Sequence, residues 1–437
     1  MMKKLFTLLA VTIAFTINAQ TNTNTGTESL NDEDTGTNNS AFGYQSLKSN
    51  ISNKNSAFGA ESLEFNTTGF FNSAFGYQAL QSNTEAKSNS AFGHRSLTSN
   101  TTAEYNSAFG DLALEDNSTG GSNTALGYGV LKNNLEGKFN TAVGSRSMET
   151  NNSDYNTAVG ALALAGDNWG MSITNANHNT ALGYQALSKN EGSRNVATGS
   201  RALKNNTSGN DNVATGYYAL NSNTTASFNT AYGSMSLYSN TGANNTALGY
   251  WSLNSNTTGA NNTAFGYKAE ASADNATNQT IIGYEATGQA DNSVVLGNDD
   301  VTAVYMGEDS GAKVYAGEGS FTGNMTIGGD VVVSSDARLK ANIVSLGSTL
   351  AKLLLIDGKS YTMKKNGKQK IGVLAQDIQK VFPELVTTDE KDMLAVNYQG
   401  LVPVLINALK EQQSEIDIYR KEVSELRQMV NQLITKQ

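Results

Sequence analysis

The sequence of 437 residues has no cysteine, two prolines and two histidines, and only 16% of its residues are charged. Without cysteine the chain can build neither a disulfide framework nor a thiolate zinc site. Collagen is excluded too, because it needs glycine at every third residue and abundant proline. A formal net charge of −9 with no basic block argues against a nucleic-acid partner. Both prolines, Pro383 and Pro403, lie near the carboxyl terminus, so a very long stretch of backbone keeps every N–H group.

Residues 1–19 have the pattern of a secretory signal peptide. Lys3 and Lys4 precede an apolar run from Leu5 to Ile17, and Ala19 is a small residue suited to cleavage. The apolar run is shorter than the roughly 20 residues that a membrane-spanning helix needs. We therefore expect cleavage after Ala19 and a mature chain without a transmembrane segment, secreted or held at the cell surface.

A short repeat fills most of the remaining chain. The motif Asn-x-Ala-x-Gly occurs fourteen times, with its glycines 16 or 17 residues apart except for one step of 23 residues. That step holds an insertion over residues 166–176, which includes Trp169. The motif glycines are Gly43, Gly59, Gly76, Gly93, Gly110, Gly127, Gly144, Gly160, Gly183, Gly199, Gly216, Gly233, Gly249 and Gly266, followed by Gly283 and Gly297 in two degenerate copies. A period this short indicates a stacked repeat architecture.

Each repeat has the composition of one solenoid coil. The alanine, the residue before the glycine and a leucine four residues after it supply apolar groups that only stacking can bury. The Asn and Gly positions suit left-handed or tight backbone at the corners. Asn, Thr and Gly are poor helix formers, so we expect two short strands per coil. The sequence thus predicts a mainly β solenoid of about 15 coils over residues 39–298, preceded by a linker over residues 20–38.

The Asn-Ser/Thr-Ala-hydrophobic-Gly units of residues 39–298 resemble the head repeats of trimeric autotransporter adhesins of the YadA type. This resemblance implies a left-handed parallel β-roll in which three chains pack side by side. The repeats themselves carry no pattern of catalytic or metal-binding residues: His94 and His178 lie at unrelated repeat positions, and Asp and Glu form no recurring pairs. We therefore expect no cofactor and no metal. Trp169 and Trp251 leave open a contact with sugars, although a single aromatic on a coil more often packs on its neighbours.

The pattern changes after residue 298. Residues 299–334 alternate β-forming residues with glycine, which predicts a connector of short strands. The charge density then rises and predicts a small α+β domain over residues 335–402, with a helix over residues 346–356, strands on both sides of residues 365–367 and a strand over residues 394–397.

Residues 403–437 predict a helix with a heptad seam. Two sets of positions alternate in steps of three and four residues without a slip. The first set is Leu409, Ile416, Val423 and Val430, and the second is Leu405, Gln412, Tyr419, Leu426 and Leu433. We expect a coiled coil between copies of the chain. The alternative is a single amphipathic helix packed on its own domain.

The segment from Ser334 onward resembles the peptidase S74 domain, the intramolecular chaperone at the carboxyl terminus of phage tail spikes and endosialidases. The resemblance rests on Ser-Asp-x-Arg-x-Lys, on Gly-Val-x-Ala-Gln, and on a tyrosine leading into a Leu/Ile-rich helix that reaches Lys-Glu. In that family a serine and a lysine five residues later form a self-cleaving dyad, which implies Ser335 and Lys340 here. The bond cut is the one before the serine, Ser334–Ser335. The resemblance thus implies an autoproteolytic serine endopeptidase that acts once on its own chain.

The dyad has a consistent physical basis. A serine hydroxyl is a weak nucleophile until a base removes its proton, and lysine serves as that base only when neutral. Burial of Lys340 on trimer assembly would favour the neutral amine. Asp336 and Arg338 are expected to hold the loop through a charge-assisted pair. The alternative makes Ser335-Asp336 a helix N-cap and Lys340 a surface charge.

Together these features predict a secreted or cell-surface homotrimeric fibre whose carboxyl-terminal chaperone directs assembly and then cuts itself off. In a stalk of near-identical coils, slipping by one unit pairs equivalent residues, so a trimerising domain would set the alignment. One alternative is an adhesin whose outer turns, or residues 166–176, bind a surface glycan or a host-cell receptor. Another is a polysaccharide-degrading enzyme of the tail-spike type, which the lack of a carboxylate cluster in the coils argues against.

Overall fold

A computed structural model describes residues 22–30, 36–166, 175–305, 314, 325, 333–364, 367–388 and 392–435. The chain divides into two compact units, Met1–Val314 and Tyr315–Gln437. The predicted signal peptide, Trp169 and most of the predicted connector lie outside the described residues.

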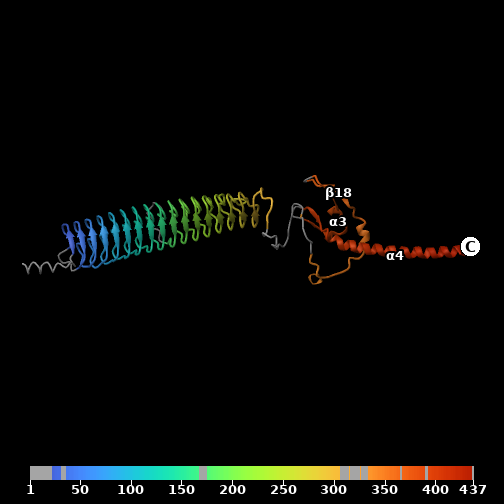
Figure 1. Cartoon of the computed structure of the whole chain (residues 1–437), viewed down its shortest axis with the longest axis horizontal. Coiled ribbons are helices and arrows are strands. Elements are labelled where there is room, and N and C mark those ends of the chain that lie inside the picture. Colours follow the sequence, from blue (N-terminus) through green and yellow to red (C-terminus); the bar gives the residue numbers. More distant parts are fainter. Residues whose placement is uncertain are drawn as a thin grey trace, which may run out of the picture. The chain divides into compact units, whose positions relative to one another are not determined.

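The first unit is a parallel β-solenoid. Its described residues form seventeen three-residue strands, and each strand pairs in parallel with the next one along the chain, so that equivalent residues of successive coils lie side by side (Figure 1). Ala57, for example, pairs with Ala74 of the following strand. The strands are β1 (Thr23–Thr25), β2 (Ser40–Phe42), β3 (Ser56–Phe58), β4 (Ser73–Phe75), β5 (Ser90–Phe92), β6 (Ser107–Phe109), β7 (Thr124–Leu126), β8 (Thr141–Val143), β9 (Thr157–Val159), β10 (Thr180–Leu182), β11 (Val196–Thr198), β12 (Val213–Thr215), β13 (Thr230–Tyr232), β14 (Thr246–Leu248), β15 (Thr263–Phe265), β16 (Thr280–Ile282) and β17 (Val294–Leu296).

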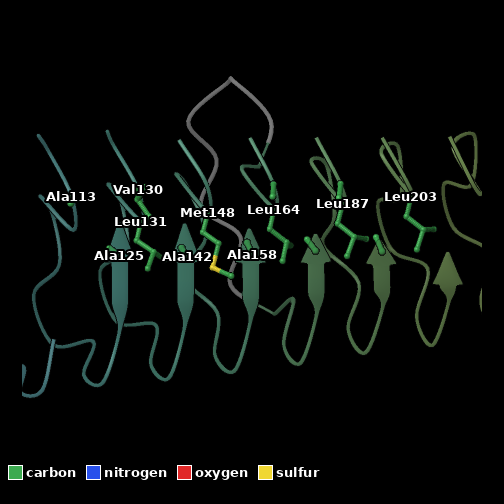
Figure 2. Close-up of a cluster of buried hydrophobic side chains, with 14 of the residues drawn as sticks. Ala113, Ala125, Val130, Leu131, Ala142, Met148, Ala158, Leu164, Leu187 and Leu203 are labelled. Atoms are coloured by element: carbon green, nitrogen blue, oxygen red, sulfur yellow. The ribbon is translucent and has the colours of Figure 1, made fainter. Parts of the chain in front are cut away.

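The core of the solenoid consists of stacked rows of side chains, and two of these rows run through every regular coil. The central alanine of each regular strand and the leucine four residues after the glycine are buried; Ala108 and Leu114 are both 0% exposed. Figure 2 shows these rows in the middle of the unit, where Met148 takes a leucine position between Leu131 and Leu164. Because each coil is so thin, its apolar residues are covered only by the coils before and after it.

The prediction of two strands per coil is wrong, because the leucine segment is not extended. Leu80 has φ +53° and Gln78, two residues earlier, has φ +56°, which is left-handed backbone that no strand adopts. Such a conformation costs a non-glycine residue about 1–2 kcal/mol. Burying a leucine side chain gains about 1.5–3 kcal/mol, which offsets that strain. In its described residues each coil therefore has one strand, and turns complete the circuit.

The motif glycine is required by the close stacking of coils. Gly110 has φ +139°, and a Cβ atom placed on it would lie 2.2 Å from the backbone oxygen of Gly127 in the next coil. Both the backbone conformation and the space therefore exclude any side chain at this position.

The motif asparagines form a buried hydrogen-bonded ladder, whereas the sequence predicted left-handed or tight corners for them. Asn106 Oδ1 accepts the backbone N–H of Asn123 in the next coil at 2.9 Å, and Asn106 Nδ2 donates to the Gly120 carbonyl at 2.9 Å. A second row links side chains directly, as Asn117 Nδ2 donates to Asn100 Oδ1 at 2.9 Å. The asparagines thus satisfy buried backbone groups that the turns leave unpaired.

The solenoid begins one coil earlier than the sequence predicted. Thr23–Thr25 pairs with Ser40–Phe42, and Leu30 is buried at 7% exposure, so residues of the predicted linker over 20–38 form a coil. Gly26 lies 17 residues before Gly43, so the repeat spacing already contained this signal. Asn24 stands where the repeat motif has alanine, so this coil departs from the motif.

The second unit is a small α+β domain, as predicted. In order it contains η1 (Ala337–Leu339), α2 (Leu350–Leu353), the antiparallel pair β18 (Lys359–Thr362) and β19 (Gln369–Gly372), α3 (Ala375–Val381), η2 (Pro383–Leu385), the antiparallel pair β20 (Val386–Thr388) and β21 (Leu394–Val396), and α4 (Leu401–Ile434). Its small core includes Ile378, Phe382, Leu385 and Val404. The predicted helix over residues 346–356 is confined to α2, and the terminal helix begins at Leu401, with Pro403 in its first turn where a missing N–H costs nothing.

Candidate active site

The structure brings the two predicted dyad residues into contact. Lys340 Nζ lies 2.7 Å from Ser335 Oγ, within hydrogen-bonding distance. The single turn η1 lies between the two residues and returns the chain so that side chains five positions apart meet. A hydroxyl in direct contact with an amine is the arrangement in which the amine, once neutral, can take the hydroxyl proton.

Asp336 and Arg338 hold this turn in place. Asp336 caps η1, because its Oδ1 accepts the backbone N–H of Arg338 at 2.9 Å. The Arg338 guanidinium binds the same carboxylate through Nε at 3.1 Å and an Nη at 2.6 Å. These bonds from the Arg338 side chain lower the pKa of the Asp336 carboxyl, and the Asp336 carboxylate raises the pKa of Arg338. The charge-assisted pair and the N-cap, predicted as alternatives, are thus both present.

The dyad is exposed in the single chain. Ser334, Ser335 and Lys340 all lie on the surface, and the apolar residues around them are exposed too: Leu339 is 74% and Val344 is 83% exposed. An apolar segment of this kind next to an amine is suited to burial against another surface.

The Gly-Val motif meets the motif tyrosine in the folded domain. Tyr398 Oη accepts the backbone N–H of Val373 at 3.2 Å. A Cβ atom on Gly372 would lie 2.8 Å from Tyr398 Oη, so this glycine leaves room for the tyrosine. The Gly-Val motif and the tyrosine, which are 25 residues apart, are therefore joined by a hydrogen bond from a backbone N–H to the tyrosine hydroxyl.

Glu411 is a residue of the second unit whose contacts the sequence did not predict, although the Lys-Glu end of the helix motif contains it. Its carboxylate accepts the backbone N–H of Thr349 at 2.6 Å, the backbone N–H of Leu350 at 3.1 Å and the hydroxyl of Ser348 at 2.9 Å. The backbone hydrogen bond from Thr349 is the largest cause that lowers the pKa of Glu411. These contacts join residues about sixty positions apart in the sequence, which motif spacing does not reveal.

The seam of α4 lies on the surface of the single chain. Leu409 is 63%, Tyr419 63%, Val423 48% and Leu426 55% exposed. α4 has 34 residues, and its buried residues are Val404 and Ala408, near its beginning. Only the first turns of the helix therefore pack on its own domain. Among the helices that the structure describes, none is long and apolar enough to cross a membrane.

The described coils offer no second catalytic candidate. His94 Nδ1 lies 2.8 Å from an Asp111 oxygen, and no group of three or more metal-ligating side chains was found among the described residues. Trp251 stacks on Tyr250, with ring centroids 5.8 Å apart. Rings of successive coils also stack on one another, with centroids 5.3 Å apart for Tyr267 and Tyr284.

Comparison with known protein families identifies the same segment of the chain. Residues 335–387, which begin at the dyad serine, match the family model of the chaperone of endosialidase, peptidase S74. The second unit contains a peptidase S74 domain.

The chain is also similar to curated long tail fiber proteins Gp37. It is 35% identical to that of Escherichia phage AR1 over 92 residues, which are 19% of this chain and 8% of the relative. It is 30% identical to that of Salmonella phage S16 over 112 residues (23% and 15%) and 32% identical to that of Enterobacteria phage M1 over 97 residues (20% and 39%). The matches span less than half the length of each relative.

Proposed function

We propose that the protein is an exported homotrimeric fibre whose S74 domain aligns three chains and then cuts the bond between Ser334 and Ser335. The observation that carries the proposal is the contact of 2.7 Å between Lys340 Nζ and Ser335 Oγ. The similarity to long tail fiber proteins supports a fibre located outside the cell, and the predicted signal peptide provides the route of export.

The cleavage chemistry needs only these groups and water. Neutral Lys340 takes the proton of the Ser335 hydroxyl, and Oγ attacks the carbonyl carbon of Ser334. The C–N bond between Ser334 and Ser335 breaks, the Ser335 nitrogen takes up a proton, and an ester links Ser334 to Ser335 Oγ. Water then hydrolyses this ester, which leaves a carboxylate on Ser334 and restores the Ser335 hydroxyl.

Two uncovered apolar surfaces support assembly of identical chains. One is the seam of α4 described above. The other is the outer face of the solenoid sheet, since the strand residue after each buried alanine points away from the core. Along β2 to β6 this face carries five stacked phenyl rings with centroids 4.6–4.9 Å apart: Phe42, Phe58, Phe75, Phe92 and Phe109. Because every coil presents nearly the same surface, alignment along the stalk is weakly specified, and a terminal trimerising helix would set it.

Denaturing gels of the secreted wild-type protein and of Ser335→Ala test the proposal. The wild type should give two fragments, residues 20–334 and 335–437, and Ser335→Ala a single chain of residues 20–437. The masses of the wild-type fragments check the signal cleavage and the Ser334–Ser335 cut together. Identical full-length bands from both proteins would refute self-cleavage.

A further inference from the structure

Glu411 joins the helix that carries the seam to the chain that carries the dyad. Its carboxylate accepts hydrogen bonds from residues 348–350 at 2.6, 2.9 and 3.1 Å, and the Thr349 hydroxyl lies 3.3 Å from its Oε1. Charge-assisted bonds of this kind are roughly twice as strong as neutral ones. All these donors belong to consecutive residues, so a single side chain determines where this short segment lies on α4.

Further contacts reinforce the same attachment. Asn407 Nδ2, one helical turn before Glu411, donates to the Gly347 carbonyl at 2.5 Å. The Thr349 hydroxyl donates to the Val404 carbonyl at 3.2 Å, and Thr349 is only 2% exposed. Residues 347–350 are therefore bound to α4 at several successive points, and Glu411 provides the largest share of the bonds.

The attachment is near both functional elements in the sequence. Lys340 and Gly347 are seven positions apart, so the connecting chain reaches at most about 25 Å even when fully extended. On the other side, Glu411 directly precedes Gln412 and follows Leu409 by two residues, and both neighbours are positions of the predicted seam. The anchoring of residues 347–350 on α4 therefore limits how far Lys340 can lie from the predicted seam.

We propose that Glu411 is a positioning residue for self-cleavage: it fixes residues 348–350 to the assembly helix and so places the Ser335–Lys340 segment against the assembled chains. The proposal rests on the proposed function. Glu411 does not touch the reacting atoms, so its removal should slow cleavage within assembled trimers rather than prevent their assembly.

The experiment compares Glu411→Gln with Glu415→Gln in the full chain. Glu415 lies one turn further along α4, and its carboxylate is not the acceptor for Ser348, Thr349 or Leu350. Glutamine at 411 keeps the size of the side chain but loses the charge and one acceptor oxygen. We expect cleavage per trimer to slow about 10-fold or more in Glu411→Gln, since small misplacements of reacting groups have effects of this size. Glu415→Gln should cleave at the wild-type rate.

Assembly and local order are measured separately. In the Ser335→Ala background, Glu411→Gln should still form trimers by light scattering, while the Thr349 and Leu350 amides exchange their hydrogens faster. Asn407→Ala, which removes a neighbouring bond, should slow cleavage to a smaller extent, and it provides a second test if Glu411→Gln does not fold. Cleavage of Glu411→Gln within two-fold of the wild-type rate, or a loss that only follows a loss of trimer, would overturn the positioning role alone. An uncleaved wild type would overturn the proposed function together with it.

Discussion

Lys340 Nζ and Ser335 Oγ meet across one turn of 3-10 helix, and Asp336 and Arg338 inside that turn brace each other. The contact between the two predicted dyad residues is thus formed by local structure within a single chain. The local structure does not bury the Lys340 amine. The apolar residues around it are exposed to solvent as well. Contact of the two groups and burial of the amine are therefore separate requirements, and each can be tested.

Lys340→Arg tests the requirement for a removable proton. Arginine preserves the positive charge and approximate length but does not lose its proton in proteins, so it cannot act as the base. We expect cleavage to fall by about 100-fold or more, the range for removing a general base, while trimers still form. Fragment release is followed on denaturing gels. Lys364→Arg, at an exposed position, serves as the control, and wild-type cleavage by Lys340→Arg would exclude lysine as the base.

Val423→Asp tests whether the exposed seam of α4 drives assembly. Val423 is 48% exposed in the single chain, and a carboxylate there would have to be buried without a partner if α4 forms a coiled coil. We expect the variant to lose both trimer, measured by light scattering, and cleavage. Ser424→Asp places the same charge next to the seam and should retain both. If Val423→Asp remained trimeric, the seam would not be the assembly surface.

Gly110→Ala tests the close stacking of the coils. The added Cβ would lie 2.2 Å from a backbone oxygen at φ +139°, so we expect a loss of stability of about 3 kcal/mol or more. Gly129→Ala is the matched control, since φ is +59° there and the nearest atom lies 3.7 Å away, on the Arg146 side chain. It should cost about 1 kcal/mol. Thermal unfolding followed by circular dichroism gives both values, and equal effects would contradict the stacking explanation.

Glu270 predicts a pH dependence at the end of the solenoid. It occupies the leucine position of its coil, and burial raises its pKa to about 7, although the backbone N–H groups of Ser255 and Asn254 lower it. The folded chain therefore holds this proton more tightly than the unfolded chain. Its stabilising effect is complete below about pH 4.5 and is lost as the pH rises through about 7.

Glu270→Gln removes this titration. We expect hydrogen exchange of the backbone amides around Asn254 to accelerate between pH 5 and pH 8 in the wild type, after correction for the intrinsic rate, and much less in the variant. Glu285→Gln, at an exposed ion pair with Lys268, should behave like the wild type. The same pH dependence in Glu270→Gln would show that another group is responsible.

Much of the architecture could be predicted because it repeats. The spacing of the glycines, the alanine before them and the leucine after them indicated a stacked β-solenoid without any structure, since a periodic backbone must place equivalent residues on one another. The resemblance to the S74 family implied the Ser335 and Lys340 pair, and both residues belong to one short motif, so a single turn is enough to bring them together.

The conformation within each coil could not be predicted in the same way. Leu80 in left-handed backbone contradicts local preference, and only the coils above and below it provide the burial that offsets the strain. The Asn106 ladder likewise needs a neighbouring coil at hydrogen-bonding distance. The prediction of two strands failed, and the asparagine ladder was missed, because the reasoning considered one coil at a time.

The sequence by itself therefore determined the period of the solenoid, the change to a second unit and the motif that holds the dyad, because each depends on residues close together in the chain. Only the tertiary structure decided the single strand per coil, the extra amino-terminal coil and the attachment of Glu411 to residues 348–350. These depend on which distant backbone groups come within about 3 Å of one another, and that is set by packing rather than by spacing.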